Sequence, residues 1–394
     1  MLPLKTAQTV EKDLAVYIHW PFCKFKCPYC DFNSHVREKI EHKDWTGAYL
    51  AEMKFYREKT GPRNVISVFF GGGTPSLMEP ATVEAVIDAV DKLWGINKDT
   101  EITLEANPTS VEAEKLKGFK GAGVNRVSLG IQSLRDEDLK KLGRQHSAKE
   151  ALAAVKMAAE IFDRFTFDLI YARPGMTVKA WRQELSEALQ YVGSHMSLYQ
   201  LTIEEGTAYH TLHQRGELVI PDEEAAANLF ETTQEMMEAK GLPAYEISNH
   251  AKPGEESRHN LAYWKYADYV GIGPGAHGRL SFDGEKWATR AHRAPEIWME
   301  KVRQYGHGAH PFESIDLLKR GQEMLLMGLR LTEGIALDAF KEETQTPLLR
   351  FLNTSRLQRL TDGGFLEVDN NRMTATKAGR QRLNAVLSSL VADS

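Results

Sequence analysis

The stretch Leu14–Asp31, LAVYIHWPFCKFKCPYCD, joins a short apolar segment to a loop that contains all three cysteines of the chain. The apolar residues Leu14–His19 predict a buried strand. The cysteines follow as Cys23, Cys27 and Cys30, in the spacing Cys-x3-Cys-x2-Cys. A four-iron cluster held by protein alone needs four thiolates, so three leave one iron open. The sequence therefore predicts a [4Fe-4S] site with an open iron directly after the first strand.

Other uses of the three cysteines fit less well. Zinc could take them together with His19 or His35, but structural zinc sites usually pair their ligands in two separated couples. A disulfide would leave one of the three thiols unpaired. Buried apolar cysteines are a poor match for a loop whose intervening residues are lysines, prolines and aromatics.

The cysteine loop also carries a family resemblance. Tyr29 stands before the third cysteine, and Tyr17-Ile-His-Trp-Pro-Phe-Cys23 leads into the first. This pattern resembles the radical S-adenosylmethionine (SAM) superfamily, in the branch that contains oxygen-independent coproporphyrinogen III oxidase and the HemW group of heme chaperones. The resemblance implies that SAM chelates the open iron and that an electron from the cluster cleaves it into methionine and a 5′-deoxyadenosyl radical. It also implies that Tyr17 and Tyr29 belong to the SAM site.

Composition sets the class of protein. The chain has 394 residues, of which 42% are apolar and 26% charged, enough to bury one large core and a smaller second one. A formal charge of −5 gives no reason to expect a nucleic-acid partner. Because no apolar run approaches the roughly 18 residues of a membrane span, we expect no integral membrane protein, although peripheral contact stays open. Cysteine confined to one site fits a reducing compartment, so we expect a cytoplasmic location.

Strand-like and helical patterns alternate along the first 200 residues, which predicts an α/β fold with a parallel sheet. Six such units match the partial (β/α)6 barrel that the resemblance implies for residues 1–200. The predicted strands are Leu14–His19, Val65–Phe70, Glu101–Ala106, Arg126–Gly130, Thr166–Ile170 and Met196–Leu201. The predicted helices are Asp44–Glu58, Pro80–Leu93, Val111–Lys117, Ala148–Phe162 and Val178–Tyr191.

Polar motifs follow several of these strands, where the chemistry of such barrels lies. Gly71-Gly72-Gly73-Thr74-Pro75 is a tight turn that a ligand can approach closely. Glu105 is a carboxylate at the end of an otherwise apolar strand, and it would be costly there without a cation or donors. The resemblance implies that Gly72, Gly73 and Thr74 hold the amino group of SAM and that Glu105 contacts SAM.

Three further residues complete the SAM site that the resemblance implies. Gln132 follows the fourth strand, Arg144 lies twelve residues on, and Asp168 is embedded among apolar neighbours. Taken alone, a guanidinium is a natural partner for a carboxylate, SAM's included, and a buried acid is hard to explain as surface. The chain departs from the family at Ala172-Arg173-Pro174-Gly175, where relatives have Gly-Leu-Pro-Gly.

Residues 201–310 contain the string Arg258-His259-Asn260-Leu261-Ala262-Tyr263-Trp264. It resembles HNxxYW, a motif of the HemW group that is taken to hold heme through its histidine. An imidazole can be an axial iron ligand, and Tyr263 and Trp264 supply flat apolar surface for a porphyrin. Judged without the resemblance, one histidine beside aromatics is more often a hydrogen-bonded structural residue. We expect residues 201–310 to extend the barrel and to carry a heme site at His259, Asn260, Tyr263 and Trp264.

Residues 311–394 change character. Helical patterns at Leu317–Leu331, Ala336–Phe340 and Thr354–Thr361 precede a hairpin with its turn at Asn370-Asn371. This order predicts a small winged-helix-like α+β domain, which the resemblance also implies. A basic stripe that would favour nucleic acid is missing from it.

Two functions remain for the whole chain. One is a heme chaperone that binds heme and transfers it to apo-hemoproteins such as respiratory enzymes, with the cluster and SAM serving transfer or homodimerisation. The other is an oxygen-independent coproporphyrinogen III dehydrogenase, whose radical starts two oxidative decarboxylations. The oxidase has a fourth cysteine where this chain has Phe32, a longer segment before its cluster, and no HNxxYW motif. All three differences favour the chaperone.

Overall fold

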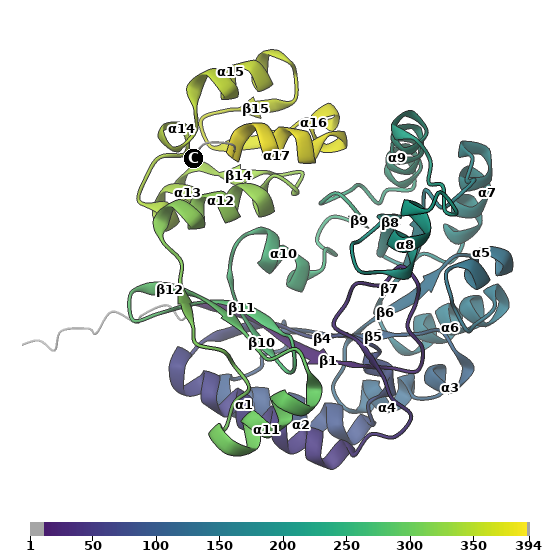
Figure 1. Cartoon of the computed structure of the whole chain (residues 1–394), viewed down its shortest axis with the longest axis vertical. Coiled ribbons are helices and arrows are strands. Elements are labelled where there is room, and N and C mark those ends of the chain that lie inside the picture. Colours follow the sequence, from purple (N-terminus) through teal and green to yellow (C-terminus); the bar gives the residue numbers. More distant parts are fainter. Residues whose placement is uncertain (1–11, 392–394) are drawn as a thin grey trace, which may run out of the picture.

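The computed structural model describes residues 12–391 (Figure 1). Its centre is one eleven-stranded sheet in the order β13-β12-β11-β10-β1-β4-β5-β6-β7-β8-β9. Six neighbouring strands run parallel, as the sequence predicts, with β1 beside β4 and each later strand beside the one before. They are β1 (Asp13–Trp20), β4 (Asn64–Gly72), β5 (Glu101–Ala106), β6 (Arg126–Gln132), β7 (Arg164–Tyr171) and β8 (His195–Gln200).

Helices cover the outer face of these strands (Figure 1). They are α1 (His42–Thr60), α2 (Pro80–Trp94), α3 (Ser110–Ala113), α4 (Leu116–Gly121), α5 (Asp136–Lys141), α6 (Ala148–Ile161) and α7 (Val178–Ala188). The prediction of one helix at Val111–Lys117 is wrong, because α3 ends at Ala113 and α4 begins at Leu116. The other helices and strands predicted for the first 200 residues are present, with ends that differ from the prediction by at most three residues, and β5 matches it at both ends.

Further strands extend the sheet on both sides, so the barrel is partial. Antiparallel β9 (Asn249–Ala251) follows β8, and β10 (Asp268–Ile272) lies parallel to β1. Beyond β10 come β11 (His277–Phe282), β12 (Glu285–Arg290) and β13 (Glu313–Ser314). A separate pair, β2 (Phe22–Cys23) and β3 (His35–Val36), frames the cysteine loop. The helices between residues 201 and 310 are α8 (Ala208–Gln214), α9 (Glu223–Ala239), α10 (Arg258–Trp264) and α11 (Pro295–Tyr305). A short 3-10 helix, Pro75–Leu77, follows β4.

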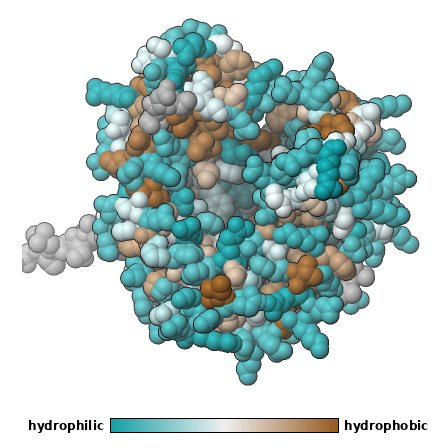
Figure 2. All heavy atoms as spheres, in the orientation of Figure 1, coloured by the Kyte–Doolittle hydropathy of each residue, from teal (hydrophilic) through white to brown (hydrophobic). Residues whose placement is uncertain are grey.

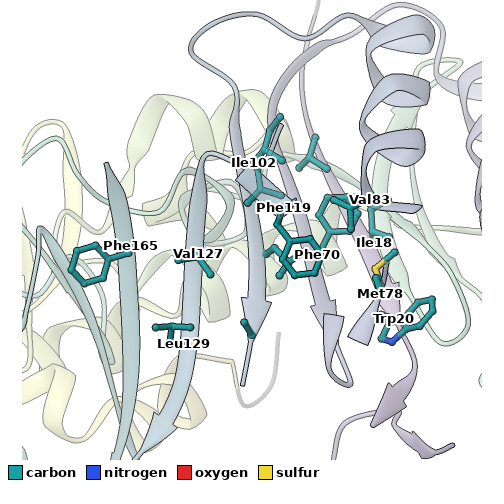
Figure 3. Close-up of a cluster of buried hydrophobic side chains, with 14 of the residues drawn as sticks. Ile18, Trp20, Phe70, Met78, Val83, Ile102, Phe119, Val127, Leu129 and Phe165 are labelled. Atoms are coloured by element: carbon teal, nitrogen blue, oxygen red, sulfur yellow. The ribbon is translucent and has the colours of Figure 1, made fainter. Parts of the chain in front are cut away.

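The two faces of the sheet differ in chemistry. Alternate residues such as Ile18 and Phe70 pack outward against Val83 of α2 and Phe119 of α4, in one continuous apolar core (Figure 3). The intervening residues point into the barrel and are largely polar, for example Arg126, which is 3% exposed. A polar interior needs internal partners.

Helix α10 supplies many of these partners. In Figure 1 it lies within the curve of the sheet, between β10 and β9. Glu101 of β5 accepts hydrogen bonds from the Ser257 hydroxyl and the His259 backbone N–H, both at 3.3 Å, and from Arg164 Nη1 at 2.8 Å. The helix that carries the HNxxYW motif is therefore anchored to the barrel wall by a buried carboxylate.

The C-terminal residues form helices and a hairpin, as predicted, around a second apolar cluster that includes Leu325, Phe340 and Met373. The sequence pattern does not show β14, which pairs with β16 as a third strand. Tyr266 packs into the same cluster although it lies in the middle segment. The elements are α12 (Leu317–Gly328), β14 (Ile335–Ala336), α13 (Leu337–Thr344), α14 (Leu348–Phe351), α15 (Thr354–Asp362), β15 (Leu366–Val368), β16 (Arg372–Ala375), α16 (Lys377–Gln381) and α17 (Leu383–Val391). The division into residues 1–200, 201–310 and 311–394 stays a prediction.

Within residues 12–391, we find no helix whose length and hydropathy would allow it to cross a bilayer.

Glu52 of α1 joins segments that are far apart in sequence. Its buried carboxyl accepts the backbone N–H of Gly273 and that of Gly308, each at 2.8 Å, and the Trp298 indole N–H at 3.0 Å. Burial raises the pKa of Glu52 to about 7, and the donated hydrogen bonds oppose this rise. Above that pH both oxygens are acceptors, which matches three donors.

We expect Glu52→Gln to lower the free energy of unfolding by about 1–3 kcal/mol, because an amide N–H2 would face N–H donors in the core. Chemical denaturation at about pH 8, above the raised pKa, measures the loss. The matched control is Glu58→Gln on the exposed side of the same helix. Equal stability of the two variants would contradict the role assigned to Glu52.

Candidate functional site

The cysteine loop begins where β1 ends, at the carboxyl ends of the parallel strands. Cys23 lies on β2 and is buried, whereas Cys27 and Cys30 are partly exposed. Thr74 donates its hydroxyl to Cys23 Sγ at 3.3 Å, and Arg144 Nη1 lies 3.6 Å from Cys27 Sγ. Burial raises the pKa of the Cys23 and Cys30 thiols. A bound metal centre reverses this preference, since it binds the thiolate.

A large cavity opens beside the loop. Its volume is about 1520 Å³, above the roughly 300–1,000 Å³ of a pocket for one drug-sized ligand. It lies between the barrel and the C-terminal domain, where Figure 2 shows a hollow on this face of the molecule. The sequence-predicted residues that line it are Cys23, Cys27, Tyr29, Cys30, Gly72, Gly73, Thr74, Glu105, Gln132, Arg144 and Asp168. The fold thus brings the three thiols and most of the predicted SAM residues to one cavity.

The glycine turn fixes the cysteine loop to the sheet. The backbone N–H of Gly73 donates to the Trp20 carbonyl at 2.6 Å, and that of Thr74 donates to the Phe22 carbonyl at 2.8 Å. A Cβ on Gly73 would lie 2.6 Å from the Phe22 carbonyl oxygen, so only glycine permits this approach. Because an ammonium group only donates hydrogen bonds, an ammonium ligand would bind carbonyl oxygens of the turn.

Two carboxyl groups form an acidic end of the cavity. Burial raises the pKa of Glu105 to about 8, with a further rise from nearby Asp168 and an opposing hydrogen bond from the Gly72 backbone. Burial likewise raises the pKa of Asp168 to about 6, although hydrogen bonds from Ser197 and Ser128 oppose the rise. Both carboxylates would be stabilised by a cationic ligand.

Arg144 and Gln132 lie beside this acidic end. Arg144 Nη2 donates to Asn107 Oδ1 at 2.5 Å and to the Gly130 carbonyl at 2.6 Å. Gln132 has φ +65°, a left-handed conformation that is uncommon outside glycine, and its buried Oε1 has no hydrogen-bond partner in the described residues. A strained residue with an unpaired acceptor in a cavity is typical of a ligand-binding position.

Asn107 is a lining residue that the sequence interpretation missed. Besides accepting from Arg144, it donates from Nδ2 to the Thr74 hydroxyl at 3.3 Å. It thereby connects the two side chains that contact the thiols of Cys23 and Cys27. The signal was present, because Asn107 lies two residues after Glu105 and so faces the same side of the chain as it leaves the strand.

The predicted heme residues lie elsewhere. The cavity lining in the described chain includes neither Tyr17 nor the motif residues of α10. His259 is 1% exposed and stacks on Phe69, with ring centroids 4.8 Å apart. Its Nδ1 lies 2.9 Å from the Ser67 hydroxyl and its Nε2 lies 2.8 Å from the Tyr263 hydroxyl. Burial lowers the pKa of His259 to about 3. The imidazole is neutral and both its nitrogens are hydrogen-bonded.

Tyr17 and two further motif residues, Asn260 and Trp264, also lie outside the cavity lining. Tyr17 lies on β1 next to the His259 ring and shares a 3.1 Å hydrogen bond with His19. Asn260 Nδ2 lies 3.4 Å from the Tyr245 hydroxyl. Trp264 packs under the guanidinium of Arg330, 4.5 Å from ring centroid to Cζ, and its indole N–H is buried without a partner in the described residues.

The departure at Ala172-Arg173 has a structural explanation. Ala172 takes the left-handed conformation, at φ +55°, that glycine would adopt more easily. Arg173 turns into the protein and forms an ion pair with buried Glu184 and a second with Asp138 at 3.0 Å. Glu184 also accepts from the Ser133 hydroxyl at 2.6 Å. The arginine is therefore compensated by charge and lies outside the cavity.

Comparison with known proteins decides the family. The radical SAM superfamily model matches residues 17–188, and the HemN C-terminal domain model matches residues 315–382. The heme chaperone HemW of Escherichia coli strain K12 is 34% identical over 383 residues, which cover 96% of this chain and 98% of that protein. The chain belongs to the HemW family of radical SAM proteins. Radical S-adenosyl methionine domain-containing protein 1, mitochondrial, of Bos taurus is 38% identical over 387 residues, 96% of this chain and 87% of that protein.

A solved structure supports the fold of the HemW family member described here. Coproporphyrinogen III oxidase (HemN) from Escherichia coli superposes with a TM-score of 0.80 at 19% identity, covering 96% of this chain and 90% of that one. At this identity the likeness concerns the fold, including the partial barrel and its C-terminal domain.

Membership of the radical SAM superfamily implies a [4Fe-4S] cluster and SAM for this chain. The residues fit both groups. Three soft thiol ligands share one loop at the cavity, and carboxyl groups and an unpaired amide oxygen lie beside it.

We expect Gly73→Ala to lower the free energy of unfolding by about 1–3 kcal/mol and to reduce iron loading, because the new methyl group displaces the backbone before Cys23. Denaturation curves and iron analysis after anaerobic reconstitution measure both effects. Gly47→Ala is the control, since a Cβ there meets nothing within 4 Å and the site is an exposed helix interior. That control should gain about 0.5–1 kcal/mol. An undisturbed Gly73→Ala would contradict the close approach.

Proposed function

We propose that this protein is a heme chaperone, which binds heme and transfers it to apo-hemoproteins such as respiratory enzymes. The observation that carries the proposal is likeness along nearly the whole chain to bacterial proteins named heme chaperone HemW. The HNxxYW motif on α10 adds a histidine beside aromatic rings. Phe32, at the position of the oxidase's fourth cysteine, lines the cavity and is 57% exposed.

The site residues take these roles in our proposal. Cys23, Cys27 and Cys30 hold the [4Fe-4S] cluster, which supplies an electron for SAM when both are bound. Thr74 and Arg144 donate to the sulfur atoms and position the loop. SAM contacts fall to Tyr29, Gly72, Gly73, Glu105, Gln132, Arg144 and Asp168, all on the cavity. Tyr17 does not line the cavity. We propose that it positions the site indirectly, through its hydrogen bond to His19.

His259 is the proposed axial ligand of heme iron. Burial keeps its imidazole neutral, as a metal ligand must be. In the tautomer with a proton on Nδ1, Ser67 accepts that proton's hydrogen bond and the Tyr263 hydroxyl donates to Nε2. A hydrogen bond at one ring nitrogen orients the other toward a metal. Iron would therefore replace the Tyr263 hydroxyl at Nε2, which requires a local movement of α10 or of the Tyr263 ring.

Homodimerisation stays a prediction. So does a cytoplasmic location, and the cattle relative has "mitochondrial" in its name. The alternative function, coproporphyrinogen III dehydrogenase, shares the fold and is a possible outcome of the experiment that follows.

Addition of heme to the anaerobically reconstituted protein should give a heme complex without turnover of coproporphyrinogen. In His259→Ala we expect heme binding to weaken by tenfold or more, because the iron loses its nitrogen ligand. Optical titration measures binding, and a product assay measures coproporphyrinogen oxidation.

Two variants make this result specific. His195→Ala removes another buried histidine. Its Nδ1 lies 2.8 Å from the Thr166 hydroxyl and its Nε2 lies 3.0 Å from the Tyr245 hydroxyl, so its environment matches that of His259. This variant therefore measures how far the general loss of stability lowers heme binding. Tyr263→Phe removes the competing hydroxyl and should bind heme at least as tightly as wild type. Coproporphyrinogen turnover by wild type would establish the enzyme instead, and undiminished binding in His259→Ala would place heme elsewhere.

Affinity for SAM should rise with pH. The Glu105 carboxyl is protonated below its pKa of about 8 and Asp168 below about 6, and only the ionised forms attract the sulfonium cation. Binding therefore releases protons, and we expect the dissociation constant to fall by about tenfold between about pH 6 and about pH 9. Anaerobic calorimetry in two buffers of different ionisation enthalpy measures affinity and proton release together.

The Glu105→Gln variant should lose the upper part of this pH dependence, while exposed Glu58→Gln keeps all of it. A pH-independent affinity in wild type would show that these carboxyl groups do not face the cationic part of SAM.

A further inference from the structure

The end of the cavity opposite the cysteine loop is built by the C-terminal domain. Arg380, Gln381 and Arg382 line it where α16 meets α17, and Arg330 lines it from the residues after α12. In Figure 1 the helices α16 and α17 face α9 across this opening. Three arginines therefore line this end of the cavity, whereas the buried carboxyl groups of Glu105 and Asp168 line another part of it.

Among the described residues, Arg330 is paired with buried Glu246, whereas Arg380 and Arg382 have no carboxylate within ion-pair distance. Arg380 Nη1 contacts the Ala375 carbonyl at 3.4 Å, and burial lowers its pKa although Glu238 opposes this. Arg382 Nη1 contacts the side-chain oxygen of neighbouring Gln381 at 3.2 Å. Glu223 and Glu224, at the start of α9, also line the cavity.

Arg330 connects this wall to the HNxxYW motif. Its guanidinium lies over the Trp264 ring and its Nη2 is 3.3 Å from buried Glu246. Its Nε is buried without a hydrogen-bond partner in the described residues. A buried donor without a partner is costly, and an acceptor that reached it from a ligand would remove this cost.

The same end of the cavity also presents apolar surface, from Phe230, Ile247 and Leu383. A ligand that suits it combines a flat apolar body with anionic groups. The cavity volume of about 1520 Å³ leaves room for such a ligand in addition to SAM.

We infer that Arg330, Arg380 and Arg382 bind the carboxylates of a tetrapyrrole, so that the C-terminal domain reads its propionate groups. This inference rests on the proposed function and extends it from the iron ligand to the propionate edge of heme. Arginine is suited to the task because its fork of N–H donors matches a carboxylate.

Heme and its dimethyl ester, in which the propionates carry no charge, distinguish this role. Wild type should bind heme at least about tenfold tighter than the ester, as charge-assisted hydrogen bonds are lost with the ester. In the double variant R380Q/R382Q the preference should shrink to within about threefold, mainly through weaker heme binding. The matched control is R372Q/K377Q, which removes two cations of the same domain whose partners, Glu333 and Glu238, lie outside the cavity lining.

Each result has a definite reading. An unchanged preference in R380Q/R382Q, or an equal loss in R372Q/K377Q, overturns the assignment of the propionates to this wall while heme binding itself stands. If wild type binds neither heme nor the ester, the proposed function fails and this inference fails with it. Iron content and SAM binding of R380Q/R382Q, measured in parallel, should equal those of wild type and show that the variant is folded.

Discussion

The buried carboxylate of Glu101 connects the barrel wall to helix α10, which lies inside the barrel. It bonds Arg164 of β7 and lies 3.9 Å from Arg126 of β6, and it accepts from Ser257 and His259 at the start of α10. Breaking a buried ion pair leaves an uncompensated charge, which typically costs about 3–5 kcal/mol. The strands and the interior helix are thus held as one unit, and the position of the HNxxYW motif follows from a residue at the opposite end of β5 from Glu105.

The polar interior explains why the cavity has two different ends. Parallel strands direct alternate side chains inward, and in β5 and β7 these include Glu105 and Asp168, which line the same cavity as the thiols. The C-terminal domain, which has its own apolar core, covers the opening of the barrel and lines it with arginines. The carboxyl groups of Glu105 and Asp168 suit the sulfonium of SAM, and the arginines of the C-terminal domain suit a carboxylate. Two ligands of opposite charge can therefore bind at different places in one cavity.

Residue patterns predicted the parallel strands and, with the family resemblance, the site on the cavity. Glu105 and Asp168 could be predicted as site residues because a carboxylate on an apolar strand is costly in free energy unless it has a cation or hydrogen-bond donors as partners. The split between α3 and α4 was not readable, since helix ends depend on tertiary packing. Arg330, Arg380 and Arg382 were missed for a different reason. Each is an ordinary charged residue in its own segment; only the folding of the C-terminal domain brings them to one wall, and only its packing on the barrel makes that wall part of the cavity. The motif of His259 was recognised, but its burial behind Tyr17 and Phe69 depends on the interior helix, which no local pattern reveals.

The closed state of His259 bears directly on how a chaperone would release its cargo. With Tyr263 hydrogen-bonded to Nε2, the ligand nitrogen has an internal partner whenever heme is absent. If His259 is the iron ligand, as we propose, iron displaces that partner, and the apparent affinity for heme is then lower than the intrinsic strength of an iron–imidazole bond. Re-formation of the His259–Tyr263 bond then offsets part of the cost of losing heme to an acceptor. A permanently open histidine would bind heme more tightly and give it up less readily, whereas a histidine with an exchangeable partner favours transfer.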